Sequence, residues 1–210
     1  SYHNGTINWE QVKASGVDFV IIRCGYGRDE RGQDDRQWYR NVSECERLGI
    51  PFGVYLYSYA KDTDCARSEA QHVLRLISGH NLTYPVYYDM EDDSTIGCDL
   101  TSIATTFCNT IKSAGYAVGV YASLSWWNTY LTAPCFGQWY RWVAQYNSTC
   151  KYTGEYAIWQ YSSTGRVSGI STDVDMNYLI GYPKDHGAAS SINIPDETQN
   201  IISYSAHVSD

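Results

Sequence analysis

The sequence predicts a single α/β domain in which helices cover a parallel sheet that curls into a closed or nearly closed β/α barrel. Three observations predict this fold. Short apolar runs alternate with segments of helical periodicity, the connections are short, and six or more strands fall within about 180 residues. The length of 210 residues, with 43% hydrophobic and 18% charged residues, is typical of one globular domain. A doubly wound open sheet is the alternative, since it uses the same alternation.

Each predicted strand is a short apolar run bounded by residues that favour turns. Residues 18–24 (DFVIIRC) are rich in β-branched side chains and lie between Gly16 and Gly25. Residues 51–59 and 85–91 each begin at a proline. Continuous apolar runs of this kind are typical of parallel strands that are buried on both faces. The same pattern predicts three later strands, at residues 116–122, 139–145 and 156–161.

The predicted helices lie between these strands. The first covers residues 34–48, where apolar side chains recur at helical spacing before a glycine: Trp38, Val42, Cys45 and Leu48. Residues 64–78 repeat this arrangement, and a third helix is predicted at about residues 101–114. The segment at residues 123–131 allows only a brief helix. A regular eightfold barrel is therefore not required by the pattern.

The overall composition argues against two classes of partner. The chain carries 15 Lys and Arg against 23 Asp and Glu, a formal net charge of -8, and it has no basic run. Neither nucleic acid nor an anionic membrane is expected to bind, because both attract a basic face. No stretch approaches the roughly 20 apolar residues of a membrane span. The 20 Tyr and 7 Trp against 4 Phe fit carbohydrate binding and the filling of strands equally well.

The seven cysteines do not have the spacing of a zinc site, so no metal site is expected. Cys45, Cys65 and Cys108 occupy apolar positions of predicted helices, where a buried free thiol is the default. Cys135 and Cys150 lie in loops that flank one predicted strand and are the best candidates for a disulfide. The odd count leaves at least one thiol unpaired within the chain.

Two acidic residues project from the predicted strand at residues 85–91. Asp89 and Glu91 are two positions apart, so they point to the same side at the carboxyl end of the strand, where β/α barrels carry out chemistry. Repulsion between adjacent carboxylates raises the proton affinity of one of them, and the resulting acid–base pair is what glycoside hydrolysis needs. The alternative is that these acids only end the strand and cap the next helix. Asp175 could lie at a second strand end.

Several sequence blocks occur in the order found in the lysozymes of glycoside hydrolase family 25, and the chain resembles that family over residues 2–182. The N-terminal blocks are His3-Asn4-Gly5, Ile7-Asn8-Trp9, residues 17–23 (VDFVIIR) and Gly25-Tyr26-Gly27. The later blocks are residues 53–60 (GVYLYSYA), 88–91 (YDME), 119–123 (GVYAS), 159–162 (WQYS) and 174–178 (VDMNY). Each block alone is a weak signal, whereas the ordered set is highly specific.

The resemblance implies an irregular, flattened TIM-like β/α barrel that hydrolyses the β-1,4 bond between N-acetylmuramic acid and N-acetylglucosamine, without a metal or cofactor. By position, Glu91 matches the general acid/base, Asp89 the residue that orients and stabilises the substrate acetamido group, and Asp175 a further acidic residue of the site. The substrate's acetamido oxygen would act as the nucleophile, giving net retention. The positions expected to bind sugar are Arg23, Tyr57, Tyr121, Trp159 and Gln160.

The N-terminus departs from the family pattern. The family usually opens with a strand ending Asp-Val-Ser, whose aspartate also lines the site, and this sequence starts at Ser1, where that serine would fall. We therefore expect a catalytic barrel over residues 1–182 with a truncated first strand, followed by a tail or linker at residues 183–210 in which residues 201–208 could add a strand. The absent aspartate keeps open a second interpretation, a catalytically impaired barrel that binds glycan. The expected partner is bacterial peptidoglycan, bound by a monomer that is secreted or released as a phage or cell-wall lytic enzyme.

Overall fold

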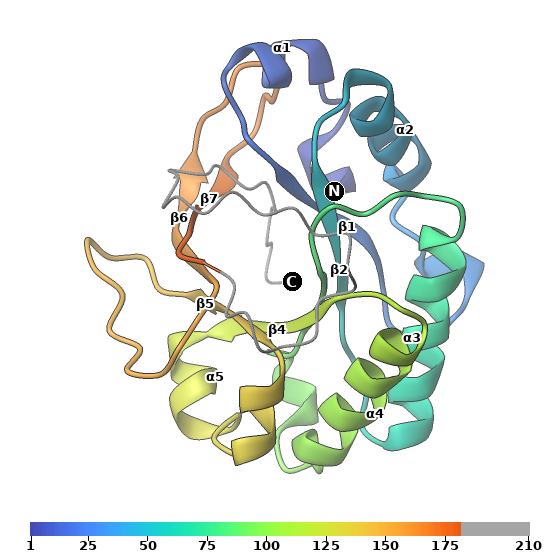
Figure 1. Ribbon diagram of the computed structural model, residues 1–210, viewed down its shortest axis with the longest axis vertical. Helices are drawn as coiled ribbons and strands as arrows, with labels where there is room; N and C mark the ends of the chain where they lie inside the picture. Colours follow the sequence, from blue (N-terminus) through green and yellow to red (C-terminus); the bar gives the residue numbers. More distant parts are fainter. Residues whose placement is uncertain (182–210) are drawn as a thin grey trace.

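The computed structural model describes residues 1–181, which form one curled sheet with helices on its outer side (Figure 1). The predicted tail at residues 183–210, with its candidate strand, lies outside the described residues. The sheet has seven strands that follow one another in chain order: β1 (Val20–Tyr26), β2 (Phe52–Tyr57), β3 (Val86–Asp89), β4 (Val118–Ser123), β5 (Tyr140–Ala144), β6 (Ile158–Gly165) and β7 (Val174–Leu179).

The strand order decides between the two predicted architectures. Strands β1 to β6 are parallel, and β7 is antiparallel to β6. A doubly wound sheet reverses its strand order at a switch point, and this sheet does not, so that alternative is wrong for residues 1–181. The sheet curls into a half-barrel whose edges are β1 and β7 (Figure 1). The α/β prediction of a parallel sheet with outer helices is confirmed, with β7 as the one antiparallel strand of the described sheet.

The helices pack mainly outside the sheet, and local signals explain where two of them end or begin. Helix α2 ends at Gly49, whose φ of +64° favours glycine. Asp62 caps α3, because its side chain accepts a hydrogen bond from the backbone N–H of Cys65. The three predicted helices are confirmed within a few residues, whereas α1 was not predicted. The bounds are α1 (Trp9–Ala14), α2 (Trp38–Leu48), α3 (Thr63–Ile77), α4 (Leu100–Ser113) and α5 (Leu124–Thr129).

The sheet separates two apolar layers of different character. The outer layer, under the helices, mixes aliphatic and aromatic side chains, whereas the inner layer is largely aromatic and includes Tyr55, Tyr87, Tyr121, Tyr140 and Trp142. Gly119 makes room for this inner layer, since a Cβ atom there would lie 2.5 Å from the Tyr87 ring and 2.5 Å from the Tyr140 carbonyl oxygen. The Tyr-rich composition thus fills the interior of the curl as well as any binding surface.

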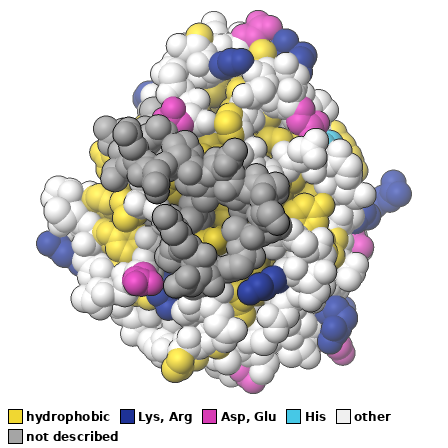
Figure 2. All heavy atoms as spheres, in the orientation of Figure 1, with side chains coloured by type: hydrophobic (Ala, Val, Ile, Leu, Met, Phe, Trp, Pro, Cys, Tyr) yellow, Lys and Arg dark blue, Asp and Glu magenta, His cyan; other side chains and the backbone are white. Residues whose placement is uncertain are grey.

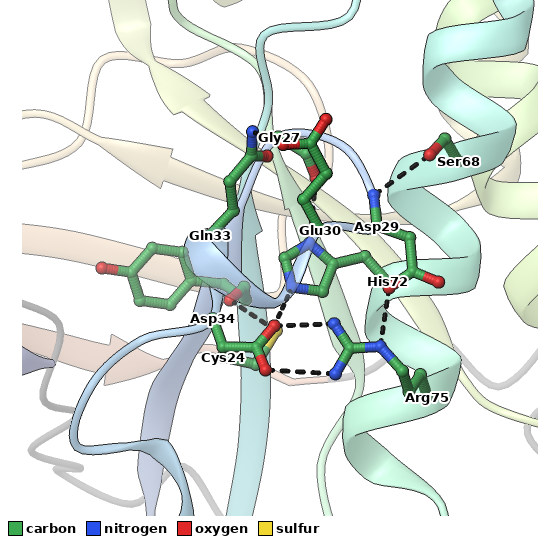
Figure 3. A network of polar contacts seen from close by, with 10 residues as sticks. Cys24, Gly27, Asp29, Glu30, Gln33, Asp34, Ser68, His72 and Arg75 are labelled. Carbon is green, nitrogen blue, oxygen red and sulfur yellow. Dashed lines mark hydrogen bonds and ion pairs between the residues drawn. The ribbon is translucent and has the colours of Figure 1, made fainter.

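An ion-pair network fastens the loop after β1 to helix α3 (Figure 3). The Asp34 carboxylate accepts hydrogen bonds from Arg75 (2.6 and 3.1 Å) and contacts His72 Nε2 at 2.8 Å, while Arg75 Nε donates to Asp29 at 2.6 Å. The other ring nitrogen of His72 faces the Gly27 carbonyl oxygen at 3.0 Å. Burial tends to raise the pKa of Asp34, but hydrogen bonds and charge from Arg75 and His72 outweigh burial and hold that pKa below its usual value.

The predicted disulfide between Cys135 and Cys150 is wrong, because all seven cysteines are free thiols. The two loops carry these residues to different neighbours: Cys150 hydrogen-bonds the Tyr156 side chain, and Cys135 lies near Cys108 of α4. Cys45 and Cys108 are buried, as predicted. Cys65 is only partly buried, and its sulfur accepts a hydrogen bond from Arg28 at 2.6 Å.

The helices and one face of the molecule can be compared with the expectations from charge and hydropathy. None of the helices within residues 1–181 combines the length and apolar character that crossing a bilayer requires. On the face shown in Figure 2, the Lys and Arg side chains lie singly or in small groups among acidic and polar ones.

Candidate active site

The site is built where three parallel strands end side by side. Tyr57 of β2, Asp89 of β3 and Tyr121 of β4 are partners in register, so they lie abreast across the sheet. Asp89 is two residues after Tyr87 and therefore shares the inner, aromatic face with it. The Asp89 side chain is buried, with only 1% of the residue exposed. The sequence correctly placed Asp89 at the carboxyl end of its strand.

Glu91 lies just beyond this strand, since β3 ends at Asp89 and not at residue 91 as predicted. Its Oε2 atom accepts a hydrogen bond of 2.8 Å from the backbone N–H of Ser123, the residue at which β4 gives way to α5. Glu91 is partly exposed. One carboxylate is thus buried among aromatic rings, whereas the other is held at the solvent side by a backbone amide.

Asp175 lies on β7, which is an edge strand of the sheet. On this strand Asp175, Asn177 and Leu179 alternate onto the inner face. Only 1% of Asp175 is exposed. Asp175 is the second residue of β7, an antiparallel strand, so its place at the site follows from the hairpin with β6.

The charges of all three acids act on one phenol, that of Tyr121. Burial raises the pKa of Tyr121 well above its ordinary value, and the charges of Glu91, Asp89 and Asp175 raise it further. The Tyr121 hydroxyl therefore stays protonated and uncharged beside the carboxylates. Two strands supply these acids: β3, which ends at Asp89 and is followed by Glu91, and the edge strand β7, which carries Asp175.

A chain of hydrogen bonds fixes the polar floor beside Tyr121. The Tyr121 hydroxyl donates to Gln160 Oε1 at 2.7 Å, and Gln160 pairs in register with Asn177 on β7. Trp142 Nε1 donates to Asn177 Oδ1 at 2.6 Å. Because each of these side chains is buried, their orientations are set before any ligand binds. Gln160 and Tyr121 therefore lie on the inner face beside Asp89, and their role in binding sugar stays a prediction.

Arg23 and Tyr57 form one side of the site, from β1 and β2. The guanidinium carbon of Arg23 lies 5.8 Å from the centre of the Tyr57 ring and 5.4 Å from that of Tyr26. Arg23 also contacts His3 Nε2 at 3.0 Å. The Tyr57 hydroxyl donates to Asp92 Oδ2 at 3.1 Å, which links the last residue of β2 to the segment after β3.

Trp159 is not brought to the inner face with the other candidate residues. Adjacent residues on a strand point to opposite faces, and its neighbour Gln160 points inward. Trp159 instead packs against Tyr161 and Tyr178, with ring centres 6.0 and 5.6 Å away, and its Nε1 donates to the Gln145 carbonyl oxygen at 2.9 Å. The structure thus places Trp159 on the outer face of the hairpin formed by β6 and β7.

Sequence reasoning missed one exposed aromatic residue at this site. Tyr146 lies two residues after β5 and is 56% exposed. Burial of the hydroxyl end, followed by the charge of Asp175, raises the pKa of Tyr146 to about 12. Trp142 and Asn177, which support the polar floor beside Tyr121, were also missed. The available signal was the alternation in residues 174–178, which puts Asn177 on the same face as Asp175.

The arrangement favours acid–base chemistry. Within residues 1–181, no cluster of three or more His, Cys, Asp or Glu side chains is arranged to hold a metal ion. Asp89 and Glu91 instead combine a buried carboxylate with a partly exposed one, two positions apart. Different environments for two neighbouring acids are the usual basis for dividing acid and base roles.

Known proteins with similar sequences or structures are cell-wall lytic enzymes by name. Lysozyme M1 of Streptomyces globisporus is 29% identical over 204 residues, and the match covers 86% of this chain and 66% of that protein. The autolytic lysozyme of Clostridium acetobutylicum is 28% identical over 177 residues, covering 82% of this chain and 52% of that protein. The modular autolysin LytC of Streptococcus pneumoniae, solved with a synthetic peptidoglycan ligand, has a TM-score of 0.75 at 35% identity, covering 83% of this chain and 44% of LytC. The chain therefore spans less than two thirds of the length of each of these proteins.

The family match covers most of the chain. The profile described as Glycosyl hydrolases family 25 matches residues 1–170, which include Asp89, Glu91 and Gln160. Asp175 lies just beyond the matched residues, on the strand that completes the described sheet. From this match, and from the curled sheet with its converging carboxylates, the chain belongs to glycosyl hydrolase family 25.

Proposed function

We propose that this chain is a muramidase that hydrolyses the β-1,4 bond between N-acetylmuramic acid and N-acetylglucosamine in bacterial peptidoglycan. The observation that carries the proposal is the convergence of Glu91, Asp89 and Asp175 around Tyr121 at one end of the sheet. Family membership and the names of the relatives support the same activity. We also propose that the curled sheet is an irregular, flattened TIM-like barrel and that residues 1–182 form the catalytic domain.

In the proposed mechanism Glu91 is the general acid. It donates its proton to the glycosidic oxygen as the bond to the anomeric carbon breaks, while the acetamido oxygen of the same sugar attacks that carbon. Asp89 accepts a hydrogen bond from the acetamido N–H and stabilises the cyclic cation that forms. Water then attacks the anomeric carbon, which opens the cyclic cation, and gives up a proton to Glu91. Because the anomeric carbon is inverted twice, the configuration is retained.

The remaining candidate residues take supporting roles. Asp175 adds a second negative charge opposite Asp89, which stabilises positive charge on the anomeric carbon. We propose that Arg23, Tyr57, Tyr121 and Gln160 bind the sugar from the inner face, whereas Trp159, on the outer face, supports the hairpin of β6 and β7 and does not contact the sugar. The enzyme is proposed to work as a monomer outside the producing cell, or as a lytic enzyme released by a phage.

The test separates hydrolysis from glycan binding. Wild-type protein should release reducing ends from purified peptidoglycan, and Glu91→Gln should release none while still sedimenting with the polymer. Glu155→Gln, which changes an exposed carboxylate outside the site, is the matched control and should retain wild-type activity. Binding without hydrolysis by the wild type would instead support the impaired glycan-binding barrel, and activity in Glu91→Gln would refute the role of Glu91.

The stereochemistry needs its own measurement. Proton NMR of a soluble glycan substrate, recorded in the first minutes of hydrolysis, distinguishes the β-anomer from the α-anomer of the new reducing end. Net retention predicts the β-anomer first, followed by mutarotation. An initial α-anomer would show inversion and would exclude the acetamido oxygen as nucleophile.

A further inference from the structure

Tyr146 lies at the carboxyl ends of the parallel strands, where the catalytic candidates also lie. It is two residues after the carboxyl end of β5, and the ends of β3 and β4 carry Asp89 and Tyr121 at that same edge. The charges that act on the Tyr146 hydroxyl are those of Asp175, Glu91 and Asp89. Tyr146 therefore lies at the end of the sheet that carries Asp89 and Tyr121, although it belongs to none of the strands that carry the acids.

The protein holds Tyr146 in place from both ends. Its neighbour Gln145 donates its backbone N–H to the Gln160 carbonyl oxygen at 3.0 Å and accepts from the Trp159 indole at 2.9 Å. The Gln145 side chain accepts from the backbone N–H of Lys151 at 2.6 Å. The Tyr146 hydroxyl hydrogen-bonds the Ser163 side chain on β6. The contacts of Gln145 hold the backbone next to Tyr146, and the contact with Ser163 anchors the hydroxyl end of the side chain, which limits the conformational entropy lost on binding.

We propose that Tyr146 is a glycan-binding residue whose exposed ring stacks against one sugar of the peptidoglycan strand and positions it over the carboxylates; this inference rests on the proposed function. Tyr146 is 56% exposed, so more than half of the residue can be reached by a ligand. A pyranose presents an apolar face of C–H groups and a polar rim, which match the face and the hydroxyl of a tyrosine. A sugar stacked on this ring would place the neighbouring glycosidic bond close to the carboxylates.

The test compares Tyr146→Ala and Tyr146→Phe with Tyr39→Ala. Tyr39 is the matched control, because it is 62% exposed and lies on α2, on the outer side of the sheet. Tyr146→Ala should lower kcat/KM on soluble glycan by about tenfold, mainly through KM, as expected for the loss of one stacking contact. Tyr146→Phe keeps the ring and should stay within about threefold of wild type, and Tyr39→Ala should be unchanged.

A binding measurement keeps this inference separate from the enzymatic proposal. In the Glu91→Gln background, adding Tyr146→Ala should weaken sedimentation with peptidoglycan, whereas adding Tyr39→Ala should not. This comparison holds even if the wild type proves to be inactive. The inference is overturned if Tyr146→Ala binds as tightly as its parent, or if its KM stays within twofold of wild type while the melting temperature is unchanged.

Discussion

Replacing Glu69 by alanine should destabilise the protein by removing a buried carboxylate that holds the loop after β2. Glu69 lies on α3 with 1% exposure, and its two oxygens accept hydrogen bonds from Ser58 Oγ (2.8 Å), Tyr88 Oη (2.5 Å) and the Tyr59 backbone N–H (2.9 Å). Ser58 and Tyr59 directly follow Tyr57. The loop at the site therefore depends on a contact made from the outer side of the sheet.

The contacts that survive set the size of the effect. In Glu69→Ala the Ser58 and Tyr88 hydroxyls still hydrogen-bond each other at 2.8 Å, but the Tyr59 N–H loses its acceptor and a cavity opens. An unsatisfied buried donor and a partly collapsed cavity together predict a loss of about 2 to 4 kcal/mol. Glu69→Gln keeps an oxygen for the Tyr59 N–H, and both hydroxyls can turn to accept from the new amide. We expect it to lose about 1 kcal/mol or less.

Urea unfolding followed by tryptophan fluorescence measures both variants, with Glu10→Ala on the exposed surface as the control. Burial raises the pKa of Glu69, so its contribution to stability is fully present below the unfolded value and is lost as pH rises through the folded value. The difference in stability between wild type and Glu69→Gln should therefore grow as the pH is lowered from neutral. Equal stability of Glu69→Ala and Glu10→Ala would refute this reasoning.

Three further changes test the packing and charge of the fold. Gly119→Ala should lose about 1 to 3 kcal/mol in urea unfolding, because its Cβ would lie 2.5 Å from a tyrosine ring, whereas Gly32→Ala places its Cβ in open space and should be neutral. Cys135 and Cys150 should both react with a thiol reagent after unfolding without reductant, and a melting temperature lowered by reductant would contradict free thiols. Because the pKa of Asp34 is lowered, the stability that it contributes is present above its unfolded value and lost as pH falls. Asp34→Asn should therefore be less stable than wild type at pH 7 and should converge with it toward pH 3, and a constant difference over that range would argue against the ion pairs.

The apolar strands were predictable because the sheet buries both of their faces. Residues 18–24 and 51–59 are continuous apolar runs and became β1 and β2. Strand β7 escaped the same reasoning, since it brings Asp175 and Asn177 to the inner face, where the sequence pattern expects apolar side chains. Its polar residues serve the site, so a periodicity search for buried residues passes over the strand.

The sequence could propose residues for the site, but it could not give their geometry. The spacing of Asp89 and Glu91 located the acids, but strand register alone brings Tyr57 and Tyr121 level with Asp89, and register depends on pairing between distant segments. Trp159 and Gln160 are adjacent, so strand alternation already implied that they face opposite ways. The loop residue Tyr146 has no periodicity to reveal it.

The identity of the new reducing end tests the proposed muramidase activity most directly. Purified peptidoglycan is digested with the wild type and with Glu91→Gln, and the products are reduced with borohydride. The reduced products are then hydrolysed to single sugars, which are separated and identified by mass spectrometry. Muramidase action predicts reduced muramic acid from the wild type and none from Glu91→Gln. Reduced glucosamine in its place would show cleavage of the other glycosidic bond, and equal yields from the two proteins would contradict Glu91 as the general acid.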